Sequence, residues 1–398
     1  MKAGSNLSLA DTLPLSSTQR FDSLTGMRAL AAIAVAIHHS IAFWPHPDGV
    51  GFVGQWGYLG VDFFFVLSGF VMQWTWQRGT TARKFLARRF ARIYPLIVVT
   101  LVGALLAWWY LQNPLAGYVG PERSIWLNLL VIQSWFFNDP GIRQAWNGVT
   151  WSLSCEMFFY VCCPLLLPRL KSLSARRCLM LIAVLYGVEC IVQLLTVPHG
   201  GEWVQNFFYY FPVARFPEFI MGALACRLLM TGYRIPIRSV WVIFGALVLA
   251  PVLLFANLVP VSNQFLSYSS LVVMPGFVVT ILVAATRDVR RRSRRGMLAT
   301  RSMVWLGDVS YAYYMVHALI LGLIARWLID GHRAPTSVWS GLFWIVVFLG
   351  ASVVVSGVTW RLIERPGQRS ILWALRANNQ GRARLTGTES ASVSPESL

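Results

Sequence analysis

Runs of about twenty consecutive apolar residues dominate this sequence, and they restrict its fold more than any other feature. Hydrophobic residues make up 56% of the chain and charged residues only 13%. A soluble chain of this length needs more charged residues to cover its surface. A membrane β-barrel would instead alternate apolar and polar residues with a period of two. The pattern therefore predicts an all-α polytopic membrane protein.

We expect about ten transmembrane helices, which form one membrane domain over residues 27–366. A polar tail precedes it at residues 1–26, and a second tail, mostly disordered, follows at residues 367–398. Residues 125–137 are apolar but too short to span, which favours a re-entrant or interfacial helix on the outer side. The predicted spans are residues 27–45, 58–77, 92–112, 148–168, 178–197, 207–229, 239–259, 265–285, 303–329 and 337–361.

The net charge of +18 comes from 34 basic and 16 acidic residues, and the basic residues are unevenly placed. Of the 34, 29 lie in alternate connections and in the two ends of the chain. By the positive-inside rule, this distribution places both termini in the cytoplasm. It argues against nucleic-acid binding, because no basic patch sits on a soluble fold. The arginine-rich connections could contact anionic membrane lipids.

Two further patterns narrow the functional class. The six cysteines lie in or beside apolar spans without a CxxC or Cys/His spacing, so they read as buried structural thiols. We therefore expect no metal site and no bound cofactor. No internal repeat is evident, which weakens a secondary-transporter interpretation, since transporters often contain repeated halves.

Ionisable side chains within the spans are few, and each is a functional candidate because burying it is costly. His39 follows Arg28 by eleven residues, which places the two about 20° apart in azimuth and about 16 Å apart along a helix. Burial favours a neutral imidazole, the form that acts as a general base. We interpret His39 as that base, and His38 as a histidine bonded to a backbone carbonyl. Asp62, near the outer end of the second span, could orient the histidine or cap its own helix.

Other polar groups recur at positions that face a helix neighbour or a ligand. Ser68 and Gly69 permit the close approach of another helix or of a ligand. Glu156 lies two turns inside the fourth span, where it demands a partner or a polar substrate. Arg215 and Glu218 stand three residues apart and are expected to pair for structural reasons.

The remaining candidates lie toward the cytoplasmic ends of their spans or form a stripe. Arg89 and Arg92 share one helix face and could grip phosphates, although ordinary positive-inside residues would look the same. Ser310, Tyr314 and His317 recur at helical spacing as an inward-facing polar stripe. Glu364 stands at the end of the tenth span, just before Pro366.

Seven phrases occur in order along the chain: R-x(10)-H, GVDFFFVLSGF, RRFARIYP, WSLSCEMFFY, RFPEFIMGAL, LGDVSYAYYMVH and ERP. Together they resemble the acyltransferase-3 family of bacterial inner-membrane O-acyltransferases, over residues 21 to 366. The chain is similar to the stand-alone form, which has no fused SGNH-hydrolase domain.

The resemblance implies transfer of an acyl group, most often acetyl, from cytoplasmic acyl-CoA to a hydroxyl of an extracytoplasmic polysaccharide or glycolipid such as lipopolysaccharide. It implies that His39 is the essential histidine and that Arg28, Arg89 and Arg92 bind acyl-CoA, which is a co-substrate. Further positions match the family motifs without a settled role: Asp62, Ser68, Gly69, Glu156, Ser310, Tyr311, Tyr314, His317 and Glu364.

Chemistry and residue placement are compatible. Direct attack of the acceptor on the thioester fits best, with His39, Asp62 and Glu156 as catalytic residues and Ser310 or Tyr314 as an oxyanion donor. An acyl-enzyme through Ser68 or His39 is an alternative. A transporter or flippase for an anionic or glycolipid solute is the rival class. A scaffold in a polysaccharide assembly complex would leave the buried polar groups unexplained.

Overall fold

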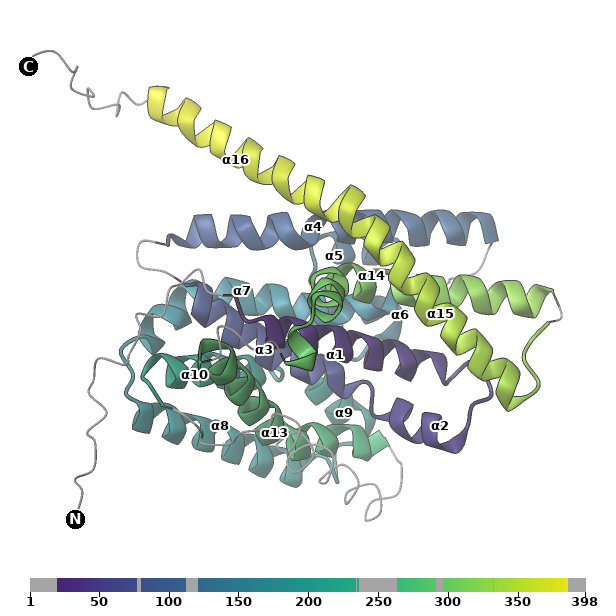
Figure 1. The fold of residues 1–398 in the computed structure, drawn as a ribbon, viewed down its shortest axis with the longest axis horizontal. Helices are drawn as coiled ribbons and strands as arrows, with labels where there is room; N and C mark the ends of the chain where they lie inside the picture. The colour runs from purple at the N-terminus through teal and green to yellow at the C-terminus, as the bar shows by residue number, and fades with distance from the viewer. Residues whose placement is uncertain are drawn as a thin grey trace, which may run out of the picture.

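The computed structural model describes residues 20–76, 80–111, 121–233, 235, 263–290, 296–331 and 333–385, and these residues form helices and connecting turns (Figure 1). The first half contains α1 (Asp22–Ser40), α2 (Asp48–Gln55), α3 (Leu59–Thr75), α4 (Ala82–Leu111), α5 (Glu122–Leu129), η2 (Gln133–Phe136), α6 (Pro140–Arg143), η3 (Gly148–Thr150) and α7 (Trp151–Leu170). The second half contains α8 (Ala175–Thr196), α9 (Gly201–Tyr210), α10 (Phe216–Met230), α13 (Asn263–Arg290), η5 (Met297–Ala299), α14 (Arg301–Asp330), α15 (Val338–Thr359), η6 (Trp360–Glu364) and α16 (Arg365–Leu385).

Six helical stretches in the described part of the chain are long and apolar enough to cross a membrane: Ala82–Leu111, Gly148–Leu170, Ala175–Thr196, Tyr268–Val289, Arg301–Asp330 and Val338–Leu375. The shorter helix Leu59–Thr75 is also apolar. Nine of the ten predicted spans overlap helices, and residues 239–259 lie outside the described residues. The chain is therefore an all-helical, multi-pass membrane protein.

The structure departs from the sequence-based prediction at several places. Residues 207–229 form two helices, α9 and α10, because Pro212 and Pro217 each lack an N–H and the chain turns between them. Residues 125–137 contain the end of α5 and the short η2 in place of one helix. The tail predicted from residue 367 begins as a helix, since α16 extends to Leu385.

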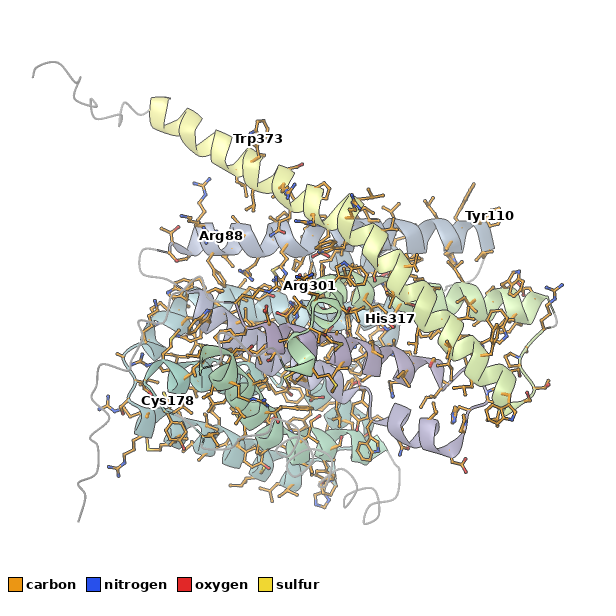
Figure 2. All side chains as sticks on the ribbon, in the orientation of Figure 1. Arg88, Tyr110, Cys178, Arg301, His317 and Trp373 are labelled. Carbon is orange, nitrogen blue, oxygen red and sulfur yellow. The ribbon has the colours of Figure 1, made fainter. Side chains whose placement is uncertain are left out.

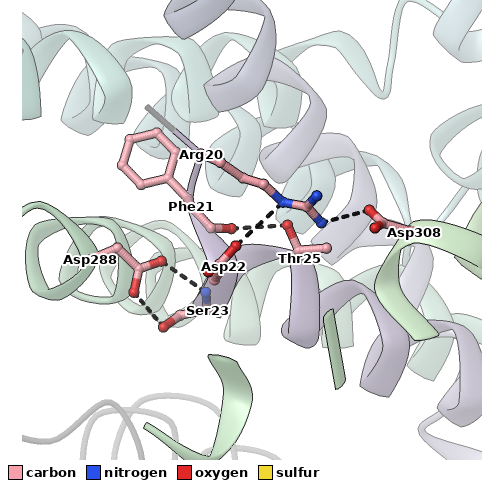
Figure 3. A network of polar contacts seen from close by, with 7 residues as sticks. All are labelled: Arg20, Phe21, Asp22, Ser23, Thr25, Asp288 and Asp308. Carbon is pink, nitrogen blue, oxygen red and sulfur yellow. Dashed lines mark hydrogen bonds and ion pairs between the residues drawn. The ribbon is translucent and has the colours of Figure 1, made fainter. Parts of the chain in front are cut away.

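The entry of the chain into α1 also differs from the expected tail. The helix starts at Asp22, inside the region 1–26, and residues 1–19 lie outside the described part. Asp288, near the end of α13, accepts hydrogen bonds from the Ser23 amide at 2.8 Å and the Ser23 hydroxyl at 2.5 Å (Figure 3). A carboxylate at a helix N-terminus satisfies free amides and complements the helix dipole. This contact holds the start of α1 against α13.

Small residues allow two helix pairs to pack backbone against backbone. A Cβ added at Gly69 of α3 would lie 1.9 Å from the Phe219 carbonyl oxygen of α10, and one at Gly222 of α10 would lie 1.8 Å from the Val66 carbonyl. In the same way, a Cβ at Gly307 of α14 would lie 1.9 Å from the Thr25 carbonyl of α1. Such close approach is typical of small residues in membrane helices. The pairs α3–α10 and α1–α14 are the most extensively packed in the described bundle.

One long helical element closes the fold. α15, η6 and α16 follow one another without a break, and α16 extends across α4 and away from the bundle (Figure 1). The five residues Trp360–Glu364 form a π-helical turn between them. Single π turns inside helices often occur at functional sites, and this one bears on the site described next.

Candidate active site

A central cavity of about 110 Å³ lies among α1, α3, α4, α7 and α14. Arginine side chains line one part of it, and hydroxyl, aromatic and apolar side chains line the rest. The lining residues are Arg28, Val61, Phe64, Phe65, Leu67, Ser68, Val71, Met72, Arg92, Ile93, Ser152, Leu153, Glu156, Tyr160, Ser310, Tyr311 and Tyr314. The cavity thus combines two arginines and one glutamate with a largely apolar wall.

A second cavity, the mouth cavity, shares Arg28 and Arg92 with the first. Its lining consists of Arg20, Thr25, Arg28, Arg92, Asp308, Trp360, Glu364 and Gln368. The π turn brings Trp360 and Glu364 to this lining, and Gln368 follows one turn later in α16. The two arginines therefore lie where the charged mouth cavity meets the central cavity.

Ion pairs hold the mouth cavity together. Arg20 donates to Asp308 of α14 at 2.7 Å and pairs with Asp22 at 3.3 Å, and both carboxylates are visible beside its guanidinium in Figure 3. Glu364 is buried, and its Oε2 has no hydrogen-bond partner within the described residues. A buried carboxylate oxygen without a hydrogen bond is costly, and Glu364 carries this cost at the wall of the mouth cavity.

His39 and His317 meet on the far side of Tyr314 from the arginines. Nδ1 of His39 lies 2.9 Å from Nε2 of His317, and the two rings stack with centroids 5.2 Å apart. The hydrogen-bond partner of His39 is therefore His317 and not Asp62. His317 is fully buried within the bundle, whereas Tyr110 and Trp373 project outward (Figure 2). His39 itself does not line the central cavity, since the lining ends at Tyr314.

Tyr314 closes the cavity toward the histidines. Its hydroxyl lies 2.8 Å from Ser152 Oγ and 3.0 Å from the Val149 carbonyl, and its ring lies 5.7 Å from that of His317. The Ser310 hydroxyl donates to the Gly307 carbonyl at 2.8 Å. Both proposed oxyanion donors thus already have protein acceptors in this state.

Asp62 lies in a buried ionic triad with Arg215 and Glu218. Arg215 donates a hydrogen bond to Asp62 at 2.6 Å and forms an ion pair with Glu218 at 2.9 Å, and the side chains of Arg215, Asp62 and Glu218 are 4%, 0% and 1% exposed. The expected pairing of Arg215 with Glu218 is confirmed. Asp62 contacts neither the central nor the mouth cavity described above.

The other predicted residues fall into clear positions. Ser68 lines the central cavity, where a ligand could approach it, whereas Gly69 allows the close approach of α10. Each of the two roles expected for this small pair therefore applies to one of its residues. Arg92 lines both cavities, whereas Arg89 lines neither and lies over the Phe85 ring at 5.6 Å. Glu156 lines the central cavity and makes no hydrogen bond to any described residue. His38 contacts the Gly54 carbonyl at 3.0 Å, as predicted.

Sequence patterns alone missed several lining residues, among them Tyr160, Trp360 and Gln368. Tyr160 follows Glu156 by four residues in the WSLSCEMFFY phrase, so helical spacing would have placed it on the same face. Trp360 and Gln368 had no such signal, because a π turn shifts the face that each presents.

The cysteines occupy α7, α8 and α10 as free thiols, four of them buried. Cys178 marks the start of α8 in Figure 2. Across the residues that the structure describes, no three His, Cys, Asp or Glu side chains come together as metal ligands.

Several known proteins are similar to this chain in sequence. An acyltransferase-domain family model matches residues 21–361. Acyltransferase MdmB of Streptomyces mycarofaciens is 30% identical over 372 residues, which cover 88% of this chain and 92% of that protein. Peptidoglycan O-acetyltransferase OatA of Listeria monocytogenes is 23% identical, and the match covers 86% of this chain and 55% of OatA. Nodulation protein 10 of Rhizobium leguminosarum is 24% identical over 78% of this chain and 82% of that protein.

No solved structure matches this chain. The family match extends over most of the described helices, including every residue of the central cavity and His39. Arg20, Glu364 and Gln368 of the mouth cavity lie just beyond its ends. This chain therefore belongs to the acyltransferase-3 family and is a membrane acyltransferase.

Proposed function

We propose that this enzyme transfers an acyl group, acetyl in the first instance, from acyl-CoA to a hydroxyl group of an extracytoplasmic glycan or glycolipid. The observation that carries the proposal is the meeting of the two cavities at Arg28 and Arg92. Phosphate groups bind well to paired arginines, and a thin acyl-bearing arm fits the apolar central cavity beyond them. The donor would therefore keep its charged part at the mouth and its thioester inside.

The arginine-rich connections support a topology in which the mouth cavity faces the cytoplasm, where acyl-CoA is found. α1 and α14 run in the same direction, since Gly307 meets Thr25 near their starts and His317 meets His39 farther along. The histidines would then lie nearer the outer face, from which the acceptor arrives. Bacterial relatives favour the cytoplasmic membrane as the location.

His39 is the general base in this proposal. Its imidazole removes the proton of the acceptor hydroxyl while the oxygen attacks the thioester carbonyl carbon. This step requires Tyr314, which closes the central cavity toward the histidines, to move aside. The carbon–sulfur bond then breaks, and the protonated imidazole returns the proton to the leaving thiolate. Glu156, which makes no hydrogen bond to a described residue, faces the acyl arm or the acceptor. The printed name of OatA suggests a cell-wall glycan as one acceptor class.

Purified protein in lipid nanodiscs tests the proposal. The enzyme is mixed with radiolabelled acetyl-CoA and with membranes from cells that lack the gene, which supply unmodified acceptor. We expect label in the glycan or glycolipid fraction and free CoA in equal amount. A transporter would leave the thioester intact, so intact acetyl-CoA and unlabelled acceptor would refute the proposal. Loss of transfer in His38→Ala but not in His39→Ala would show that His38, and not His39, is the base.

A further inference from the structure

The contact between His39 and His317 joins two helices that are far apart in the sequence. The residues are 278 positions apart, on α1 and α14, and their nitrogens are 2.9 Å from one another. A hydrogen bond between two imidazoles requires that one nitrogen carries a proton and the other a lone pair. The direction of this bond therefore determines which nitrogen of His39 is left to act as a base.

The backbone of α14 determines that direction. Nδ1 of His317 lies 2.8 Å from the Tyr314 carbonyl oxygen and 3.2 Å from the Tyr313 carbonyl oxygen. Carbonyl oxygens only accept hydrogen bonds, so Nδ1 of His317 carries the proton. A neutral imidazole has one N–H, and Nε2 of His317 is consequently the acceptor. Nδ1 of His39 must then donate to it, which leaves Nε2 of His39 with its lone pair free.

The surroundings hold His317 in this orientation. It is fully buried, and the Tyr313 ring lies nearly parallel to it at 6.1 Å and 9°. The close packing of Gly307 against Thr25 holds α14 against α1 near the starts of the two helices. A rotation of the His317 ring would break its hydrogen bonds to the backbone and to His39 together.

We propose that His317 is a positioning residue that holds His39 in the Nδ1–H tautomer, with Nε2 of His39 directed as the proton acceptor of the transfer reaction. The inference rests on the proposed role of His39 as the base, because a fixed tautomer matters only if His39 takes a proton. A neighbouring hydrogen bond that fixes the tautomer is a general way to orient a catalytic histidine. Here a second histidine, itself fixed by a backbone carbonyl, supplies it.

Nitrogen NMR tests the tautomer without any need for activity. The protein contains six histidines, and ¹⁵N-histidine labelling in nanodiscs reports which ring nitrogen of each is protonated. We expect His39 to be protonated on Nδ1, with a coupling across the hydrogen bond to Nε2 of His317. His317→Gln should preserve the tautomer, since a side-chain amide oxygen accepts the same bond. His317→Leu should abolish the coupling and convert His39 to a mixture of tautomers.

His38 is the internal control. Its Nδ1 contacts the Gly54 carbonyl at 3.0 Å, so its own tautomer is held by backbone and should not change in His317→Leu. A wild-type His39 that is protonated on Nε2 would overturn the proposal. So would a His39 tautomer that is unaffected by His317→Leu in a variant that elutes as a folded protein.

Acyl transfer from labelled acetyl-CoA to unmodified membranes supplies the second measurement. His317→Leu should lower kcat about 100-fold, in the range of general base catalysis, and leave KM for acetyl-CoA unchanged, whereas His317→Gln should retain most of the activity. Full activity in His317→Leu would refute the positioning role. Full activity in His39→Ala would instead refute the base assignment of the proposed function, and the NMR result would still report the tautomer.

Discussion

The ionic triad of Asp62, Arg215 and Glu218 allows a direct test of which buried carboxylates are structural. Arg215 is the cation between two carboxylates, at 2.6 Å and 2.9 Å. Arg215→Met leaves both carboxylates unpaired, and we expect it to lower the free energy of unfolding by about 3–5 kcal/mol. Asp62→Asn preserves the pair of Arg215 with Glu218, so it should cost only the charged hydrogen bond, about 1.5–3 kcal/mol.

Glu156→Gln is the matched control for these two variants. Glu156 lines the central cavity without a hydrogen bond to a described residue, so its neutral isostere should change the free energy of unfolding by less than about 0.5 kcal/mol. It should nevertheless abolish acyl transfer. Reversible unfolding in mixed detergent micelles measures the stabilities, and label transfer from acetyl-CoA measures the activity.

The order of the three stabilities is the decisive result. Wild-type stability in both Arg215→Met and Asp62→Asn would show that the triad does not stabilise the bundle and would refute the reasoning. A Glu156→Gln variant as unstable as Asp62→Asn would show that Glu156 has a structural partner. Asp62→Asn with wild-type stability but no activity would return Asp62 to the catalytic role that its sequence motif predicts.

Three further predictions follow from the geometry. His39→Ala should abolish glycan acylation, measured by mass spectrometry of the surface glycan, while membrane insertion stays intact; normal acylation would contradict the mechanism. Gly69→Ala should lower the free energy of unfolding by about 1–3 kcal/mol, because its Cβ meets the α10 backbone at 1.9 Å. Gly103→Ala places its Cβ in open space and should be neutral or stabilising. Equal melting curves for the two variants would disprove the close packing. Arg92→Gln should raise KM for acetyl-CoA about tenfold, as expected for the loss of one charged contact. The control is Arg88→Gln, at an exposed arginine visible in Figure 2, and this variant should keep the wild-type KM. Equal KM values in the two variants would show that the cavity arginines do not hold the donor.

Several features of the site were predictable from the sequence because they depend on neighbours along one helix. The spacing of Ser310, Tyr314 and His317 predicts one buried face, and all three are buried. The spacing of Arg215 and Glu218 predicts their ion pair, which forms at 2.9 Å. Residues three, four or seven apart lie on the same face of a helix. These predictions therefore need no knowledge of how the helices pack together.

Contacts between helices could not be predicted from spacing along one helix. From its sequence position Asp62 could orient His39 or cap its own helix, yet it pairs with Arg215 at the start of α10, because α3 and α10 approach closely at Gly69 and Gly222. The break between α9 and α10 at Pro212 is local in origin, but where it directs Arg215 depends on the packing of the whole bundle. A sequence pattern states that a buried charge needs a partner but does not identify the partner.

The sequence by itself determined the membrane class, the helical nature of most apolar segments, the uneven placement of basic residues and the family. These follow from apolar length, from charge along the chain and from short motifs, all of which are local properties. Only the tertiary structure decided that His39 bonds to His317, that the cavity ends at Tyr314 and that a π turn brings Glu364 to the mouth. The physical reason is that partners hundreds of residues apart are selected by the packing of helix faces, which no single segment of the chain encodes.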